Sequence, residues 1–168
     1  MTKKELIDIC GKSFINKLKK ELKIKPVIKI LDGNPDDYAE ACEDGVIAIF
    51  AEDVVSADKD FCKWIMAHEC RHIWQFKYVD FEDNSFTKLR KKLLEILITA
   101  ERVKNKKLKR KELLELVLDN YHDMLPEEMD ANIYAFIKTG YDFSKTHVDR
   151  RSMKRLWVHE DDKDGGKK

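Results

Sequence analysis

The stretch AHECRHIWQ, residues 67–75, contains two histidines four positions apart, His68 and His72, with Glu69 directly after the first. On an α-helix, residues i and i+4 are neighbours on one face, so both imidazole rings can bind the same metal ion. Glu69 lies about 100° further round the helix axis. It is therefore placed to reach a water molecule on that ion rather than the ion itself. This HExxH spacing indicates a zinc site with a general base.

The helix that would carry the motif is also indicated by periodicity. Residues 57–79 contain no glycine or proline, and one helical stripe runs through them. Its members are Phe61, Ile65, His68, His72 and Phe76. The alternative is that the two histidines only pack in a core or lie on the surface. The position of the motif inside a periodic helix favours the metal interpretation.

Upstream of the motif, the sequence predicts one helix followed by a small sheet. Apolar side chains recur every four positions through residues 2–23, which predicts a single helix, and Thr2 and Glu5 match a capping box at its start. Three short segments then have the composition of strands and predict a sheet of about three strands. They are residues 27–31, 38–43 and 46–51.

The third strand segment, VIAIFA at 46–51, has two interpretations. As an edge strand, it would offer free backbone groups on which a peptide substrate could add as a further strand. A continuous apolar run is equally typical of a central strand that is buried on both faces.

Downstream of the motif, the pattern is helical. Periodicity predicts helices over 86–104 and 108–123, and a last helix from Pro126, a favourable first helical position, to Gly140. The fold class that follows is α+β, with an N-terminal helix, a small sheet, the HExxH helix and a mostly helical C-terminal half. We expect a single domain over residues 1–160 and a disordered tail at 161–168.

Composition and charge further limit the class of protein to which the chain can belong. The chain has 168 residues, 43% of them hydrophobic, and a net charge of +1, so it can bury a core and its net charge selects no partner. The four cysteines include no CxxC pair, which is typical of reduced thiols. The N-terminus lacks the apolar segment of a signal peptide, and no stretch is long enough to cross a membrane. We therefore expect a cytoplasmic protein.

A catalytic zinc site needs a third protein ligand, which leaves the fourth position for water. The acidic and histidine candidates downstream are Glu95, Glu101, Asp119, His122, Glu127, Glu128 and Asp130. The segment PEEMDANIYAF, residues 126–136, stands out among them. Taken alone, its glutamates are better explained as acids that stabilise the positive end of a helix dipole; the HExxH motif upstream favours a ligand.

HExxH followed by EMDANIYA at 128–135 resembles the gluzincin metallopeptidases, which have a zincin-like fold, and most of all the ImmA/IrrE-type family. The resemblance implies that Glu128 is the third zinc ligand, ahead of Asp130 and His122. It implies that Asn132, one turn later, supports that ligand from behind. It also implies that the small residues Ala131 and Ala135 allow this helix to lie close to the HExxH helix.

These residues together predict a zinc metallopeptidase. Glu69 would act as general base, and zinc would be held by His68, His72 and Glu128. The resemblance implies a cytoplasmic protein substrate, with limited cleavage of a regulator or repressor in a bacterial or phage setting. Tyr141 and His147 are weaker candidates for stabilising the oxyanion.

A second hypothesis belongs to another class of function. The protein would bind zinc without catalysis and act as an interaction or regulatory module. Its basic segment RVKNKKLKRK, residues 102–111, would then bind nucleic acid through phosphates, or an acidic partner.

Overall fold

A computed structural model describes residues 2–31, 38–50, 58–79 and 85–142. Its elements, in chain order, are α1 (Lys3–Cys10), α2 (Lys12–Leu22), β1 (Val27–Leu31), β2 (Ala39–Ala41), β3 (Val46–Phe50), α4 (Lys59–Tyr78), α5 (Ser85–Lys104), α6 (Arg110–Tyr121), a 3-10 turn η1 (His122–Met124) and α7 (Pro126–Thr139). The α+β class is confirmed, and every helix predicted downstream of residue 57 is present. The predicted tail at 161–168 lies outside the described residues.

The helix expected over residues 2–23 is two helices, so that prediction was wrong. Gly11 has φ 85° and ends α1, and α2 begins at the next residue. The buried face continues across the break, because Leu6, Cys10, Leu18 and Leu22 all belong to one core cluster. The every-four spacing therefore describes the face that is buried but not the continuity of the helix. The predicted capping box of Thr2 and Glu5 is confirmed.

Gly11 supports a stability prediction. A Cβ atom at this residue would meet no other atom within 4 Å, so the cost of a side chain is a backbone cost. Gly11→Ala should lower the free energy of unfolding by about 1–3 kcal/mol, because its positive φ is rarely adopted by other residues. Urea denaturation followed by circular dichroism measures this. Ser13→Ala, at an exposed helical position, is the matched control and should change stability by less than about 0.5 kcal/mol.

The sheet has three strands, as predicted, in the order β1-β3-β2. Strand β3 pairs parallel with β1 and antiparallel with β2. The segment VIAIF is thus the central strand, which confirms the buried interpretation and overturns the edge-strand one. The apolar run suits this position, because the strand has a neighbour on each side and packs against α4, and its residues from Ile47 to Phe50 are buried. Strand β2 has no partner on its outer edge among the described elements.

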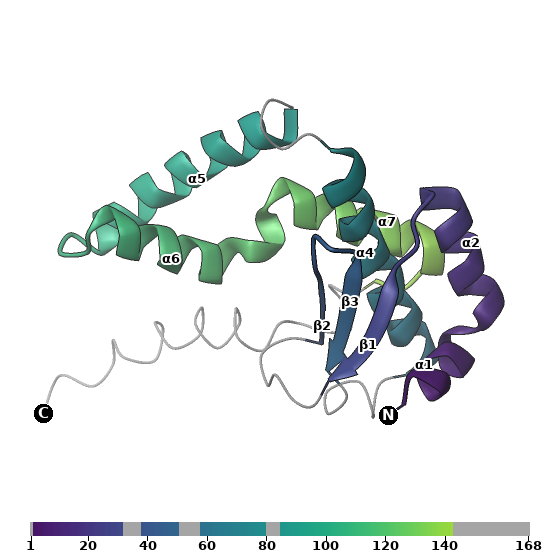
Figure 1. Ribbon diagram of the computed structural model, residues 1–168. Helices are drawn as coiled ribbons and strands as arrows, with labels where there is room; N and C mark the ends of the chain where they lie inside the picture. The colour runs from purple at the N-terminus through teal and green to yellow at the C-terminus, as the bar shows by residue number, and fades with distance from the viewer. Residues whose placement is uncertain (1, 32–37, 51–57, 80–84, 143–168) are drawn as a thin grey trace, which may run out of the picture.

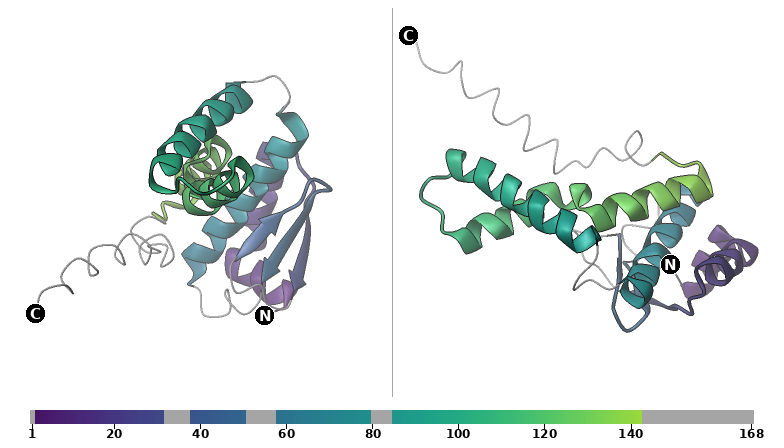
Figure 2. Two further views of the ribbon diagram at one scale, coloured as in Figure 1. Left: turned by 90° about the vertical axis from the view of Figure 1, so that its left-hand side faces the viewer. Right: turned by 90° about the horizontal axis from the view of Figure 1, so that it is seen from above.

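Helix α4 is the centre of the molecule. It contacts α1, α2, α7, β2 and β3, and Figure 2 shows it between the sheet and α7. Its start is capped by Asp58, whose carboxylate accepts hydrogen bonds from the backbone N–H groups of Asp60 and Phe61. A helix surrounded in this way is apolar on most of its circumference, and α4 has buried residues on every turn from Phe61 to Gln75.

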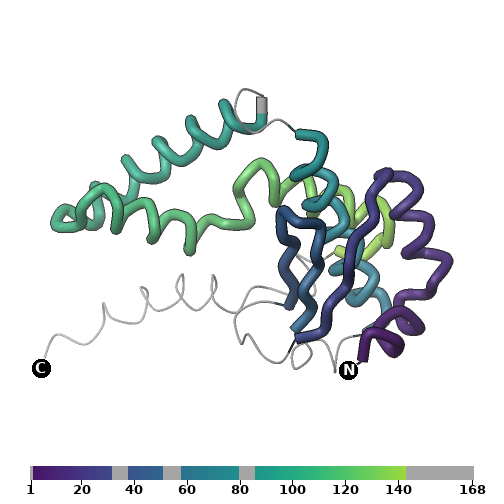
Figure 3. The backbone as a smooth tube through the Cα atoms, viewed as in Figure 1, coloured from purple at the N-terminus to yellow at the C-terminus, as the bar shows by residue number. Residues whose placement is uncertain are grey.

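Helices α5 and α6 form a hairpin that projects from the body of the molecule (Figures 1 and 3). The hairpin has its own small core of Ile98, Leu113 and Val117. Helix α7 then returns to α4, starting at Pro126 and ending before Gly140 in the left-handed conformation, as predicted from these two residues. Among the described residues, no helix is long and apolar enough to cross a membrane.

Candidate metal centre

Helices α4 and α7 bring three of the predicted side chains together. His68 and His72 lie one turn apart on α4, and Glu128 lies in the first turn of α7. The two histidine Nε2 atoms are 2.9 Å apart, and each is 3.3 Å from Oε2 of Glu128. All three residues are buried. Within the described ranges, this is the one group of histidine, cysteine or acidic residues able to hold a metal ion.

The spacing of these atoms fits zinc. Tetrahedral coordination with bonds of about 2.0–2.1 Å places neighbouring ligand atoms about 3.3 Å apart. The three observed separations, 2.9, 3.3 and 3.3 Å, are close to that value. Three Lewis-basic atoms that converge in a buried space need a cation or a shared proton between them, since their lone pairs otherwise repel. The donor set of two imidazoles and one carboxylate is also that of a known class of catalytic zinc site.

His72 and Glu128 form a buried ion pair, and His68 contacts the same carboxylate. Burial lowers the pKa of His72, but its hydrogen bond with Glu128 and the charge of that carboxylate outweigh burial and raise the pKa to about 9. Burial likewise raises the pKa of Glu128, and hydrogen bonds from His68 and His72 outweigh it, so this pKa falls well below its ordinary value. A metal ion would take the place of the proton held between them.

Gln75 orients His72 from behind. Oε1 of Gln75 lies 2.8 Å from Nδ1 of His72, so Nδ1–H donates to this oxygen when the ring is neutral. The free lone pair of the imidazole is then on Nε2, which faces the other two ligands. The amide nitrogen of Gln75 donates to the backbone oxygen of Glu127 at 2.9 Å and to Oδ2 of Asp130 at 2.8 Å. Gln75 thereby links the ligand on α4 to the start of α7.

Asp130 belongs to this supporting network and not to the ligand group. Its carboxylate accepts two hydrogen bonds from Arg71, at 2.6 and 3.0 Å. Burial raises the pKa of Asp130, but the bonds from Arg71 and Gln75 outweigh it and lower the pKa. The guanidinium of Arg71 in turn stacks over Trp74, 3.8 Å from the ring centroid. Sequence reasoning missed both Arg71 and Gln75, although Gln75 stands three residues after His72 and so faces the same side of the helix.

A prediction follows for Gln75. Gln75→Leu removes the acceptor for Nδ1 of His72 and leaves its N–H buried without a partner. We expect the affinity for zinc to fall by about 10- to 100-fold, as is usual for the residues that orient a metal ligand. Competition with a chromophoric chelator measures the affinity. An affinity of Gln75→Leu equal to that of the wild type would contradict an orienting role.

Glu69 lies beside the ligand group and faces the sheet. It is buried, and burial raises the pKa of its carboxyl, while the nearby charges of His68 and His72 and a hydrogen bond from the backbone of Ala41 oppose that rise. Ala41 is the last residue of β2. Glu69 is therefore held between the edge strand and the group of His68, His72 and Glu128, and it is not a member of that group. A buried carboxyl beside a group that could hold a metal is a candidate for general-base chemistry.

His68 is positioned by packing. Its ring stacks on Trp64, with the centroids 4.9 Å apart. Among the described residues, its Nδ1 atom is buried and has no hydrogen-bond partner. Cys70, inside the motif, is also buried, and burial raises the pKa of its thiol to about 12. Cys70 is outside the ligand group, as its position on the far side of the helix predicts.

Of the other candidates, Glu95 and Glu101 belong to α5 and Asp119 to α6, whereas the next three lie near the centre. His122, on η1, approaches Glu128 from the other side, with Nε2 3.5 Å from Oε1, and its side chain is largely exposed. Glu127 forms an ion pair with Arg90 of α5. Asn132 is half-buried and makes no side-chain hydrogen bond within the described part of the chain, so its supporting role stays a prediction.

Tyr141 and His147 were the two candidates for stabilising the oxyanion. Tyr141 packs against the core, and its ring centroid is 5.8 Å from that of Phe61. His147 lies outside the described residues. Neither role is tested by these positions, and both stay predictions.

The basic segment 102–111 lies at the tip of the α5–α6 hairpin, away from α4 (Figure 1). Part of its charge is already paired within the chain. Arg110 pairs with Glu95, Lys104 with Glu101 and Lys111 with Glu115. These pairs lower the charge available for phosphate, and nucleic-acid binding stays a prediction.

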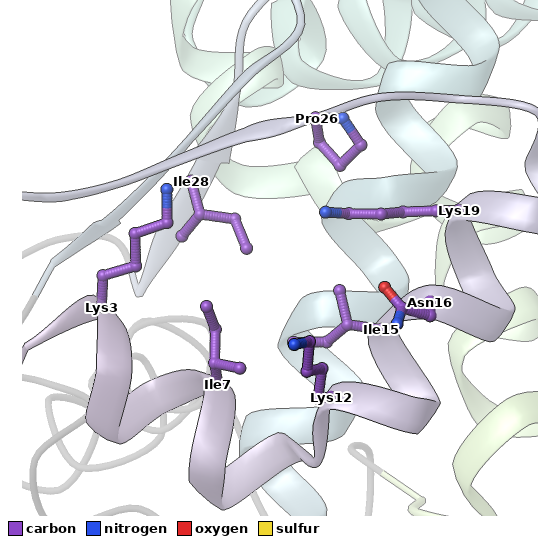
Figure 4. A pocket seen from close by; sticks show the side chains of 8 residues that line it. All are labelled: Lys3, Ile7, Lys12, Ile15, Asn16, Lys19, Pro26 and Ile28. Atoms are coloured by element: carbon purple, nitrogen blue, oxygen red, sulfur yellow. The ribbon is translucent and has the colours of Figure 1, made fainter.

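A small pocket of about 130 Å³ lies elsewhere, between α1, α2 and the start of β1 (Figure 4). Its floor is apolar and three lysines surround it. The lining residues are Lys3, Ile7, Lys12, Ile15, Asn16, Lys19, Pro26 and Ile28. None of them belongs to the metal centre, so the pocket and the candidate chemistry are separate.

Comparison with known proteins adds no relative: no protein family model, no curated protein and no solved structure matches this chain. The functional argument therefore depends on the geometry of the centre itself.

Proposed function

We propose that this protein is a zinc-dependent peptidase. The observation that supports the proposal is the buried group of His68, His72 and Glu128 with a fourth buried carboxyl, Glu69, beside it. A purely structural zinc site has four protein ligands, whereas a catalytic one has three and an open position. Three ligands with an adjacent general base are thus better explained by catalysis than by structural metal binding.

Each residue of the centre would have its own role in the reaction. His68, His72 and Glu128 would hold the metal, and Gln75 would keep His72 in the tautomer that binds it. A zinc ion held there would supply Lewis acidity, which activates water near neutral pH and polarises a carbonyl group. Glu69 would take a proton from the attacking water and pass it to the leaving amine.

The substrate would add to the edge of the sheet at β2. This strand has an open edge within the described fold, and its last residue, Ala41, contacts Glu69. A peptide that pairs with β2 would therefore pass the general base. This assigns to β2 the role that sequence reasoning gave to residues 46–51. From the family resemblance, we extend the proposal to limited cleavage of a regulatory protein.

The proposal is tested with the purified chain of residues 1–168 and a library of internally quenched fluorescent peptides. We expect cleavage by the zinc-loaded protein, loss of cleavage after chelation, and recovery on adding zinc back. If fluorescence increases as fast in the chelated sample as in the zinc-loaded one, the proposal is wrong. Stoichiometric zinc binding without cleavage of any peptide or of unfolded casein would favour the non-catalytic zinc module instead.

A further inference from the structure

The two carboxylate oxygens of Glu128 face different partners. Oε2 lies 3.3 Å from Nε2 of both His68 and His72. Oε1 is turned towards η1, where Nε2 of His122 lies 3.5 Å from it. The carboxylate therefore lies between the histidine pair of α4 on one side and a third histidine on the other.

The backbone holds His122 close to the first turn of α7. The backbone oxygen of His122 accepts a hydrogen bond from the backbone N–H of Leu125 at 2.9 Å. Leu125 is 2% exposed, and its own backbone oxygen accepts a hydrogen bond from the N–H of Met129 in α7. Glu128 is the third residue of that helix. This short connection, anchored in the core, fixes the backbone of His122 relative to that of Glu128.

The contact suits a hydrogen bond from the imidazole to the carboxylate. An ionised carboxylate only accepts, and an imidazole that carries its proton on Nε2 donates at that atom. The separation of 3.5 Å is slightly longer than an ordinary N–H···O hydrogen bond. Because the His122 side chain is 61% exposed, it is free to rotate and close that gap. Its other nitrogen, Nδ1, lies 3.8 Å from Oδ1 of Asp123.

We propose that His122 is a positioning residue for the third metal ligand. Its Nε2–H donates to Oε1 of Glu128 and so keeps Oε2 directed at His68 and His72. The proposal rests on the metal centre of the proposed function. Carboxylates that bind metals are themselves held by hydrogen bonds from further residues. His122 would do for Glu128 what Gln75 does for His72, from a different element of the fold.

His122 is better placed to support Glu128 than to bind the metal. It contacts the oxygen of Glu128 that faces away from the histidine pair, and it is not a member of the group able to hold a metal. Its side chain is 61% exposed, whereas that of Glu128 is 12% exposed. A fourth protein ligand would also fill the position that a catalytic site keeps for water.

The test measures the zinc affinity of the chain of residues 1–168 by competition with a chromophoric chelator. His122→Ala removes the donor and should weaken zinc binding by about 10- to 100-fold. His122→Gln and His122→Asn form a matched pair. The amide nitrogen of glutamine can reach the position of Nε2, whereas that of asparagine, one bond shorter, reaches only the position of Nδ1. We therefore expect His122→Gln to regain most of the affinity and His122→Asn to resemble His122→Ala.

Cobalt provides a second readout, which a change in stability alone would not produce. The visible absorption of bound Co²⁺ depends on the number and geometry of its ligands. His122→Ala should change this spectrum, and His122→Gln should keep that of the wild type. Met124→Ala, at a 49% exposed residue of the same turn, is the control for a general disturbance of η1 and should change neither affinity nor spectrum. Urea denaturation without metal checks that each variant keeps the fold.

Four results would overturn the proposal. A zinc affinity of His122→Ala equal to that of the wild type would do so and leave the peptidase proposal in place. Equal losses in the three His122 variants, or an equal loss in Met124→Ala, would assign His122 a role in packing only. A loss in His122→Ala as large as that in Glu128→Gln would make His122 a ligand. If the wild-type chain binds no zinc, the metal centre is wrong, and the proposed function is overturned as well.

Discussion

Glu69→Gln should abolish peptide cleavage while zinc binding and the fold are retained. The change preserves the size of the side chain but removes the group that accepts and delivers the proton. General acid–base catalysis typically contributes about 10²- to 10⁴-fold to a rate, and a loss of that size is expected in kcat/KM, measured with a peptide that the wild-type protein cleaves. The zinc content should stay equal to that of the wild type, because Glu69 lies outside the ligand group.

Glu40→Gln is the matched control for this prediction. Glu40 is an exposed residue of β2, on the edge strand where the substrate is proposed to add, so its loss tests whether any nearby carboxylate matters. We expect less than about a threefold effect. Cleavage by Glu69→Gln at the wild-type rate would exclude Glu69 as the general base. A loss of both zinc and cleavage would instead move Glu69 into the ligand set.

Zinc should stabilise the wild-type protein, and loss of one ligand should remove that effect. Zinc at about 100 times its dissociation constant adds about 2.7 kcal/mol to the free energy of unfolding. For a chain of this size, that corresponds to a rise in Tm of about 5–10 °C. His72→Ala and Glu128→Gln should each lower the affinity by more than about 100-fold, so the same zinc concentration should hardly change their Tm. Differential scanning calorimetry with and without zinc measures the shift.

Glu127, the residue before Glu128, provides a control for the prediction that Glu128 is the third ligand. Glu127→Gln is one residue from Glu128 and breaks only the pair with Arg90, so its zinc-induced shift should match the wild type. Asp130→Asn and His122→Ala separate the two other candidates. A zinc affinity that survives Glu128→Gln but falls in His122→Ala would transfer the third ligand to η1.

Much of the candidate site could be predicted from local pattern. The relation of His68, Glu69 and His72 is a property of helix geometry, so it holds wherever the helix packs. The bounds of α7 followed from Pro126 and Gly140, because these residues impose backbone angles that start and stop helices. The strands were recognisable from composition because their apolar runs are short and bounded by turn residues.

Other features depend on how the elements pack, and helical periodicity alone did not predict them; Glu128 was named only through the family resemblance. Glu128 and Asp130 are two positions apart on the same helix, about 200° round its axis, so the rotation of α7 against α4 decides which one meets the histidines. That rotation places the fully buried Ala131 and Ala135 in the same stripe as Glu128, and leaves Asp130 to Arg71 and Gln75. The order of the strands has the same origin, since β3 is central only because β2 folds back beside it.

The sequence by itself determined the local geometry of the protein: which segments form helices and strands, and that two imidazoles and the carboxyl of Glu69 share one helix. The tertiary structure decided which distant carboxylate completes the group, where helix α1 ends and α2 begins, and which oxygen of that carboxylate faces His122. The physical reason is the distance along the chain over which each effect acts. Backbone angles and helical periodicity are set by neighbouring residues, whereas convergence of side chains from α4 and α7 is set by the packing of whole helices.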